Sequence, residues 1–354
     1  MTARIRSDLD AIPVYVPGRN FPGAIKLASN ETTQGPLPSV RDKIAEAVTT
    51  VNRYPDIMAT ALVDELAAML KVERENVTVG NGSVALCQEI VQITCNPGDE
   101  VVFAWRSFEA YPIITHVAGA LPVQVPLDTN HTHDLDAMLG AITERTRVVF
   151  VCNPNNPSGT VVARSALEKF LDAVPASVLV VLDEAYFEYA REDAGGEYTD
   201  GVELARGRRN VVVLRTFSKA YGLAGLRVGY AVGDPSVITA LRKVRIAFAV
   251  NSVAQHAALA SLAARDELLA RTDALVAERE RVRDALVGMG YDVPQSEANF
   301  VFMPLGDRSV PFAEGAAEVG VLLRAYGSDG VRITIGDPHE NDTFLKYAST
   351  AAPQ

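Results

Sequence analysis

A lysine, an arginine and several glycines lie together between Arg215 and Tyr230, and these residue types could hold and use a reactive cofactor. Lys219 follows a short apolar run, Val211–Leu214, that is typical of a buried strand. Arg227 comes soon after, among glycines that would let backbone approach a ligand closely. Burial and a nearby cation lower the pKa of a lysine, and its neutral amine then condenses with an aldehyde. Pyridoxal phosphate carries both an aldehyde and a phosphate, and Arg227 could bind the phosphate.

On its own, a lysine after a strand is more often an exposed surface residue, so this interpretation depends on the rest of the chain. Short apolar runs alternate with helical patterns through the middle of the sequence. This alternation predicts an α/β fold in which helices flank a mostly parallel sheet. The predicted strands are Val77–Val79, Glu100–Ala104, Val148–Val151, Val178–Leu182, Val211–Leu214 and Val228–Val232.

The pattern changes near Ser252, which predicts a second, smaller α+β domain. A long helical stretch over 257–289 is followed by short strands at 299–303 and 330–335. The N-terminal segment is rich in proline and glycine, and we expect it to pack on the small domain. The expected division is 30–250 for the large cofactor-binding domain, with 1–29 and 251–354 for the N-terminal arm and the small domain.

Polar motifs follow four of the predicted strands, at the edge of an open α/β sheet where ligands bind. Asp183 comes directly after one strand, and a carboxylate is costly to bury there without a partner. A protonated pyridine nitrogen would be that partner, and the cationic ring would stabilise a carbanion. Asn156 and Tyr186 could donate hydrogen bonds to the phenolic oxygen of the same ring. Read alone, Asp183 is equally well explained as a helix N-cap.

The remaining motifs predict a site for the phosphate of such a cofactor and a platform for its ring. Backbone N–H groups at a helix N-terminus bind phosphate well, and an arginine adds charge-assisted hydrogen bonds. Phe108 could stack on the ring face, although a phenylalanine is more often part of the core. The candidate phosphate ligands are Gly82, Ser83, Val84, Thr216 and Arg227, and Ser218 is a further candidate for cofactor binding.

Composition excludes several other classes of function. The chain has 354 residues and a net charge of −11, which argues against nucleic acid or an anionic membrane as partner. Its three cysteines show no metal-ligand spacing, and their low, odd number predicts a reducing cytoplasm. We see no export signal, no run long enough to span a membrane and no basic helix–turn–helix of a ligand-sensing regulator.

Taken together, the motifs resemble the fold-type-I pyridoxal-phosphate aminotransferases, in the branch of histidinol-phosphate and aromatic amino acid aminotransferases. KLASNET, NRYPD, NGS, NPNNPSG, DEAY, TFSKAYGLAGLR and ANF occur in the order of that family. The resemblance runs from YVPG at 15–18 to VRITIG at 331–336. It implies a large domain with a seven-stranded sheet and a smaller α+β domain.

The resemblance also implies roles for individual residues. Lys219 would bind the cofactor aldehyde covalently and then carry a proton between the substrate and the cofactor. Arg332 would bind the substrate carboxylate through two parallel hydrogen bonds, with Asn30 nearby. Tyr54 would reach the cofactor phosphate of a neighbouring subunit, which implies a homodimer with shared active sites.

The implied reaction is transamination of an aromatic L-amino acid, phenylalanine or tyrosine, with a 2-oxo acid such as 2-oxoglutarate. Arg106-Ser107-Phe108 stands where histidinol-phosphate enzymes often have proline-threonine-tyrosine, and Val84 stands where many relatives have an acidic residue. Histidinol phosphate remains the alternative donor, and decarboxylation of a phosphorylated amino acid is a less favoured reaction. Arg324 is either a ligand for an anionic substrate or a surface arginine. The expected walls of an aromatic slot are Tyr15, Val16, Tyr111, Phe248 and Tyr326.

Overall fold

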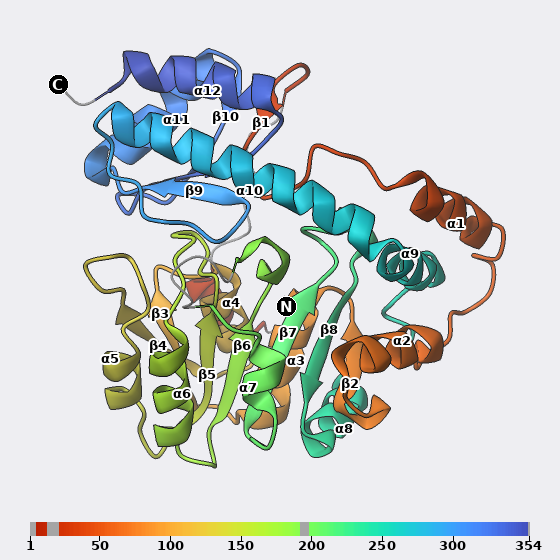
Figure 1. Cartoon of the computed structure of the whole chain (residues 1–354). Coiled ribbons are helices and arrows are strands. Elements are labelled where there is room, and N and C mark those ends of the chain that lie inside the picture. The colour runs from red at the N-terminus through yellow and green to blue at the C-terminus, as the bar shows by residue number, and fades with distance from the viewer. Residues whose placement is uncertain (1–4, 13–20, 192–197, 353–354) are drawn as a thin grey trace.

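The computed structural model describes residues 5–12, 21–191 and 198–352. They form a larger body around a seven-stranded sheet and a smaller body around short strands. Figure 1 shows the smaller body, drawn in blue, on one side of the larger one, with the long helix α10 (Arg265–Gly288) running along their boundary. Within the described ranges, no helix combines the length and the apolar character that a membrane span requires.

The large sheet confirms the predicted α/β class. All of its strands are parallel except β8, which runs antiparallel to both of its neighbours. The strand order is β2-β8-β7-β6-β5-β3-β4. The strands are β2 (Val77–Gly80), β3 (Glu100–Trp105), β4 (Leu121–Pro126), β5 (Thr146–Cys152), β6 (Leu179–Asp183), β7 (Val211–Thr216) and β8 (Gly229–Gly233).

Six of these strands lie where the sequence predicted them, and the seventh, β4, was not located. It reads LPVQVP and lies at the sheet edge, where it pairs only with β3 among the described strands. Two prolines and a polar residue interrupt its apolar run, and proline is tolerated in a sheet mainly at an edge. A strand of this composition is therefore not recognised from a continuous run of apolar residues.

Helices cover both faces of the large sheet because its strands are apolar on both sides. In β6, Val180 and Leu182 belong to one apolar layer, while Leu179 and Val181 belong to the other. The helices of this body are α1 (Pro38–Val48), α2 (Thr60–Leu70), α3 (Ser83–Thr94), α4 (Ala110–Val117), α5 (Leu135–Gly140), α6 (Arg164–Ala173), α7 (Gly201–Ala205), α8 (Pro235–Val244) and α9 (Ser252–Ala263). Short 3₁₀ turns are η1 (Ser7–Ala11), η2 (Arg74–Asn76), η3 (Phe187–Tyr189), η4 (Ala224–Leu226) and η5 (Gly306–Arg308).

The smaller body is built on two short sheets. An antiparallel sheet has the order β11-β12-β9, and β1 pairs with β10 in parallel. Since β1 belongs to the N-terminal segment, its pairing with β10 attaches this part of the segment to the smaller body. The strands are β1 (Ile25–Lys26), β9 (Phe300–Met303), β10 (Val321–Leu322), β11 (Arg324–Ala325) and β12 (Val331–Thr334), and the helices beside α10 are α11 (Ser309–Glu318) and α12 (Pro338–Thr350).

The long helix predicted over 257–289 is in fact two helices. The backbone of Ala264 leaves helical geometry, with φ −103° and ψ 22°, between α9 and α10. Ala257 of α9 packs into the core of the larger body, whereas Val282 and Leu286 of α10 pack into the core of the smaller one. Helix α9 therefore packs in the core of the larger body, and α10 passes from that core at Leu268 to the core of the smaller body. The domain boundary at residue 250 stays a prediction.

Candidate active site

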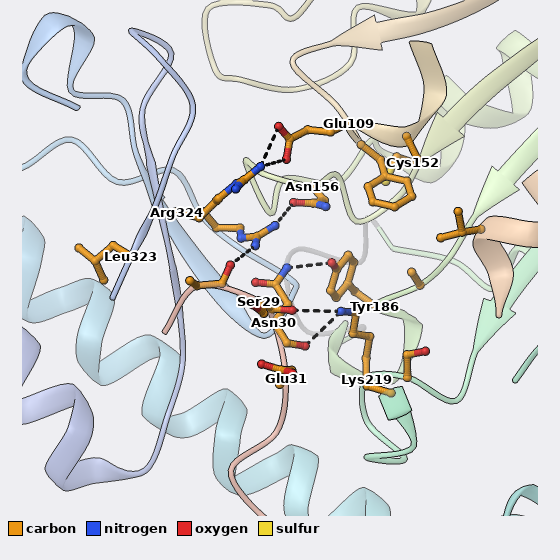
Figure 2. A pocket seen from close by; sticks show the side chains of 18 of the residues that line it. Ser29, Asn30, Glu31, Glu109, Cys152, Asn156, Tyr186, Lys219, Leu323 and Arg324 are labelled. Atoms are coloured by element: carbon orange, nitrogen blue, oxygen red, sulfur yellow. Dashed lines mark hydrogen bonds and ion pairs between the residues drawn. The ribbon is translucent and has the colours of Figure 1, made fainter. Parts of the chain in front are cut away.

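A cavity of about 670 Å³ lies where the carboxyl ends of the large sheet meet the smaller body. Figure 2 shows its labelled side chains converging from both bodies. Those from the larger body include residues that follow β2, β3, β5, β6 and β7, which is the edge predicted from the sequence. The predicted site residues that line the cavity are Asn30, Ser83, Val84, Phe108, Asn156, Asp183, Tyr186, Thr216, Ser218, Lys219, Arg227, Arg324 and Arg332.

Lys219 lies three residues beyond the end of β7, with its amine directed into this cavity. Its Nζ donates to the carbonyl oxygens of Asn30 at 3.2 Å and Ser29 at 3.5 Å. Desolvation, helped by the nearby cation of Arg332, lowers the pKa of Lys219 to about 7. A substantial fraction of the amine is therefore neutral near pH 7, as a nucleophilic lysine requires.

Asp183 is the last residue of β6 and is buried at the cavity wall. Its Oδ2 accepts a hydrogen bond from the Tyr111 hydroxyl at 2.7 Å, whereas Oδ1 has no partner among the described residues. Burial raises the pKa of Asp183 to about 6. A buried oxygen without a partner is costly, and a protonated ring nitrogen would satisfy it. No helix begins at Asp183, so the N-cap interpretation is wrong.

A cup for an anion lies at the first turn of α3. Gly82 precedes this helix with φ 78°, and the N–H groups of the first turn have no partner within the helix. A Cβ at Gly82 would collide with the guanidinium of Arg227, so only glycine allows the arginine to lie this close. Arg227 Nη1 donates to Ser218 Oγ at 3.2 Å, and Ser218 N donates to Thr216 Oγ1 at 3.1 Å. The five predicted phosphate ligands therefore lie close together, and Ser218 lies among them.

Two further predicted residues, Asn156 and Tyr186, lie between the lysine and the smaller body. Asn156 Oδ1 accepts from Arg332 Nη1 at 2.6 Å, and the Tyr186 hydroxyl accepts from Asn30 Nδ2 at 2.8 Å. Burial raises the pKa of Tyr186 well above its usual range, so the phenol stays neutral and keeps a proton to donate. The dashed lines of Figure 2 mark the bond from Asn30 to Tyr186.

Arg332 comes from β12 and reaches the cavity from the smaller body. Its second terminal nitrogen, Nη2, donates to the carbonyl of Ala28 at 2.6 Å, and its Nε has no partner among the described residues. The two acceptors on this guanidinium, Asn156 Oδ1 and the Ala28 carbonyl, are both neutral. A cation held only by neutral acceptors is suited to an anionic ligand such as a carboxylate.

Much of the cavity lining that comes from α4, α11 and β10 is apolar, and we call this part of the cavity the apolar arm. One wall comes from α4 and the loop before it, and the other from α11 and β10. On α11, Val310, Ala313 and Ala317 recur at helical spacing, a signal that could have been found in the sequence. The apolar residues of the arm are Phe108, Ile113, Val310, Ala313, Ala317, Leu322 and Leu323.

These are not the slot residues that the sequence suggested. Tyr111 is fully buried, stacks on Phe150 with ring centroids 4.5 Å apart and faces the core. Tyr326 is buried and Phe248 lies elsewhere on the surface, and neither lines the cavity. The prediction was therefore wrong for these three, because nearness to a motif does not decide which way a side chain points. Tyr15 and Val16 lie outside the described residues.

Tyr54 and Arg324 lie away from the lysine. Tyr54 is 82% exposed outside the cavity, and its ring stacks on Phe248 with centroids 4.5 Å apart. Arg324 lines the cavity at the far arm, where its Nη2 donates to both carboxylate oxygens of Glu109 at 2.9 and 3.2 Å. No cluster of potential metal ligands occurs in the part of the chain that the structure describes.

Both the sequence and the structure of this chain are similar to those of known aminotransferases. A family model described as "Aminotransferase class I and II" matches residues 22–347. Proteins named aromatic amino acid aminotransferase from Rhodococcus jostii (strain RHA1) and Rhodococcus erythropolis (strain PR4 / NBRC 100887) are 69% and 66% identical, over 99% of this chain and 96% of each relative. A solved structure of histidinol-phosphate aminotransferase from Sinorhizobium meliloti, in complex with pyridoxal-5'-phosphate, has a TM-score of 0.89 and 28% identity over 99% of both chains.

Proposed function

This chain belongs to the family of class I and class II aminotransferases, and we propose that it transfers the amino group of an aromatic L-amino acid to a 2-oxo acid. The observation that carries the proposal is the apolar arm of the cavity, which offers an aromatic side chain a wall of Ile113, Val310 and Leu323. Burial of an aromatic ring against such walls is favourable, whereas a charged side chain gains nothing there. Relatives with 69% and 66% identity carry the same activity in their names.

We propose pyridoxal 5'-phosphate as the cofactor because the chain offers a matching partner for each of its groups. The neutral amine of Lys219 suits the aldehyde, the unpaired Oδ1 of Asp183 suits the ring N–H, and the cup at Gly82 and Arg227 suits the phosphate. Phe108 is near enough to the cavity to cover a ring face. When bound, the cofactor supplies an aldehyde for the substrate amine and a cationic ring that takes up an electron pair from the α-carbon.

The side chains of the protein would bind, orient and move protons. Lys219 Nζ takes the proton from the substrate α-carbon and later returns one, which its lowered pKa allows near pH 7. Asp183 keeps a negative charge beside the ring nitrogen and so holds that nitrogen protonated. Tyr186 and Asn156 orient the ring through hydrogen bonds to its phenolic oxygen. In doing so Asn156 would exchange partners, because its Oδ1 now accepts from Arg332.

Arg332 would bind the substrate carboxylate and thereby fix which bond at the α-carbon faces Lys219. A planar guanidinium can hold a carboxylate through two parallel hydrogen bonds. The side chain of the substrate then extends into the apolar arm, away from the sheet. Asn30 links β12 to Tyr186. Its Oδ1 accepts from Thr334 Oγ1 at 2.9 Å, and its amide donates to the Tyr186 hydroxyl.

We propose that the active enzyme is a homodimer in which Tyr54 completes the phosphate site of its partner. Tyr54 and Phe248 stack on each other at the surface, and exposed apolar side chains from the same two segments accompany them. Exposed aliphatic and aromatic groups of this kind mark protein–protein contacts. The accompanying residues are Val48, Val51, Ile57, Met58, Val244 and Ile246. A cytoplasmic location is also proposed, and the three unpaired cysteines fit a reducing compartment.

Steady-state kinetics with phenylalanine, tyrosine and histidinol phosphate as donors test the substrate proposal. We expect the two aromatic amino acids to have much larger kcat/KM values than histidinol phosphate. The apolar walls suit a phenyl ring, and the phosphate that replaces the carboxylate in histidinol phosphate would need more donors than Arg332, because Arg324 is paired with Glu109. A larger kcat/KM for histidinol phosphate would reverse the assignment. Release of carbon dioxide without consumption of a 2-oxo acid would point instead to decarboxylation.

A further inference from the structure

Three arginines surround the ring of Tyr326 at the end of the cavity that belongs to the smaller body. The guanidinium carbons of Arg106, Arg324 and Arg332 lie 5.6, 5.7 and 5.7 Å from its centroid. Three cations this close together would give the substrate end of the cavity a strong positive potential. Such a potential would favour anionic side chains over aromatic ones.

Two of the three arginines are paired with carboxylates. Arg106 binds Asp329, with Nε and Nη2 at 2.8 and 2.6 Å from Oδ2, and Arg324 binds Glu109. Arg332, in contrast, has no carboxylate partner among the described residues and is held by neutral oxygens. The positive charge is thus retained on the arginine proposed to bind the α-carboxylate and is offset on the other two.

The two ion pairs differ in their relation to the cavity. Both join the segment after β3 to the smaller body, but only Glu109 and Arg324 line the cavity, whereas Arg106 and Asp329 do not. Figure 2 shows Glu109 and Arg324 facing each other beyond Asn156, with two dashed lines between them. The Glu109 carboxylate is therefore a charged group that the far end of a substrate side chain would meet.

We propose that Glu109 is a specificity-determining residue, which neutralises Arg324 and thereby disfavours substrates with an anionic side chain. The inference rests on the proposed function and names the substrate class that the same site rejects. An anionic side chain would have to displace the Glu109 carboxylate from Arg324 or lie beside it, and like charges at short distance are costly. An aromatic side chain leaves the ion pair intact and packs on the apolar walls.

Glu109→Gln tests this role because it removes the charge while keeping the shape. Asp329→Asn is the matched control, since it also removes one ion pair between the two bodies but lies outside the cavity. For holoenzyme, we expect Glu109→Gln to raise the ratio of kcat/KM for L-glutamate to that for phenylalanine by about tenfold, the size expected for one half-buried charge pair. Glu109→Gln should also lower the KM for 2-oxoglutarate. Asp329→Asn should change neither.

A second substitution separates the charge of Arg324 from other effects of the variant. In Glu109→Gln/Arg324→Gln the ratio should fall back to the wild-type value or below it, because the cation that attracts the anion is gone. If Glu109→Gln leaves the ratio unchanged, or if Asp329→Asn shifts it equally, the role assigned to Glu109 is wrong.

Binding of two inert ligands keeps this test separate from the proposed reaction. Glutarate and 3-phenylpropanoate share one carboxylate but end in a second carboxylate and in a phenyl ring. Calorimetric titration of each holoenzyme variant should show that Glu109→Gln tightens glutarate about tenfold relative to 3-phenylpropanoate. If wild-type protein does not transaminate phenylalanine, the proposed function fails. If the relative affinities do not change, the inference fails whatever the donor.

Discussion

The two ends of the cavity are built in different ways. At the sheet end, Asp183, Lys219 and the first turn of α3 each lie at or just after the end of a strand of the same seven-stranded sheet. At the substrate end, Arg332 and the walls of the apolar arm come from the smaller body and from α4. The register of one sheet fixes the first end, whereas the second depends on how two bodies meet. Residues that carry the proposed chemistry gather at the first end, and residues that would select the substrate gather at the second.

This difference separates two kinds of experimental result. Changes at the sheet end should act on all substrates alike, because every substrate would use the same lysine and the same carboxylate. Changes at the substrate end should act unequally, since donors differ only in their side chains and in how they fit the arm. If a residue has been assigned to the wrong end, its substitution should give equal effects on all substrates where unequal ones are expected, or the reverse.

The largest effect is expected from Lys219→Ala at the sheet end. Without the amine at this position, kcat for every donor should fall by at least about 10⁴-fold, the upper range for a positioned acid–base group. Borohydride reduction followed by mass spectrometry should also find no cofactor attached to the chain. Lys243→Ala on the exposed end of α8 is the control, and it should keep both properties. Normal turnover by Lys219→Ala would exclude this residue from the reaction.

Asp183→Asn should give the next largest loss of kcat, and this loss should again be the same for every donor. The amide cannot balance the charge of a protonated ring nitrogen, so we expect kcat to fall by about 10²- to 10³-fold. Tyr111→Phe, which removes the hydrogen bond to Asp183 Oδ2, should cost much less. If Asp183→Asn reduced kcat only for aromatic donors, the carboxylate would belong to the substrate end instead.

The same contrast explains how much the sequence could predict. At the sheet end most of the expected residues lie at one edge, because a residue at or soon after the end of a buried apolar run is placed by local sequence. Asp183 ends such a run, and Gly82 and Lys219 each follow one within three residues. The unpaired Oδ1 of Asp183 and the collision that a Cβ at Gly82 would cause are consequences of packing, which the sequence alone does not reveal.

At the substrate end the sequence identified the arginines but not their surroundings. Helix α4 turns Ile113 toward the cavity and Tyr111 into the core, and only the packing of the helix on the sheet decides between them. Glu109 was not singled out, since its partner Arg324 is far away in the sequence and belongs to the other body. Contacts between the two bodies depend on tertiary structure, so they cannot be predicted from a local sequence pattern.

Arg332→Lys is the exception at the substrate end, because every amino acid donor carries the carboxylate that Arg332 would bind. A lysine cannot form two parallel hydrogen bonds to a carboxylate, so KM for aromatic donors should rise and kcat/KM should fall by about 10- to 100-fold. Cofactor attachment, measured by mass spectrometry after borohydride reduction, should remain complete. Arg308→Lys in the exposed η5 turn is the control and should change neither value. An unchanged KM would show that the substrate carboxylate binds elsewhere.

The smallest effect concerns pH and tests the sheet end without any substrate. Because desolvation lowers the pKa of Lys219 to about 7, the neutral amine should increase through that pH and then reach a plateau. The rate at which cofactor-free protein attaches pyridoxal phosphate should therefore rise about tenfold from pH 6 to pH 8 and stay level above it. An ordinary lysine would instead gain about tenfold per pH unit until its pKa near 10.5.

Asp183 must be excluded as the source of this profile, because burial raises the pKa of its carboxyl to about 6 and it also titrates in this range. The same rates measured on Asp183→Asn remove that group while leaving the lysine in place. If the plateau above about pH 7 persists in the variant, the titrating group is Lys219. A rate that still rises steeply near pH 9 in both proteins would mean that the amine of Lys219 is solvated. Burial would then not lower its pKa.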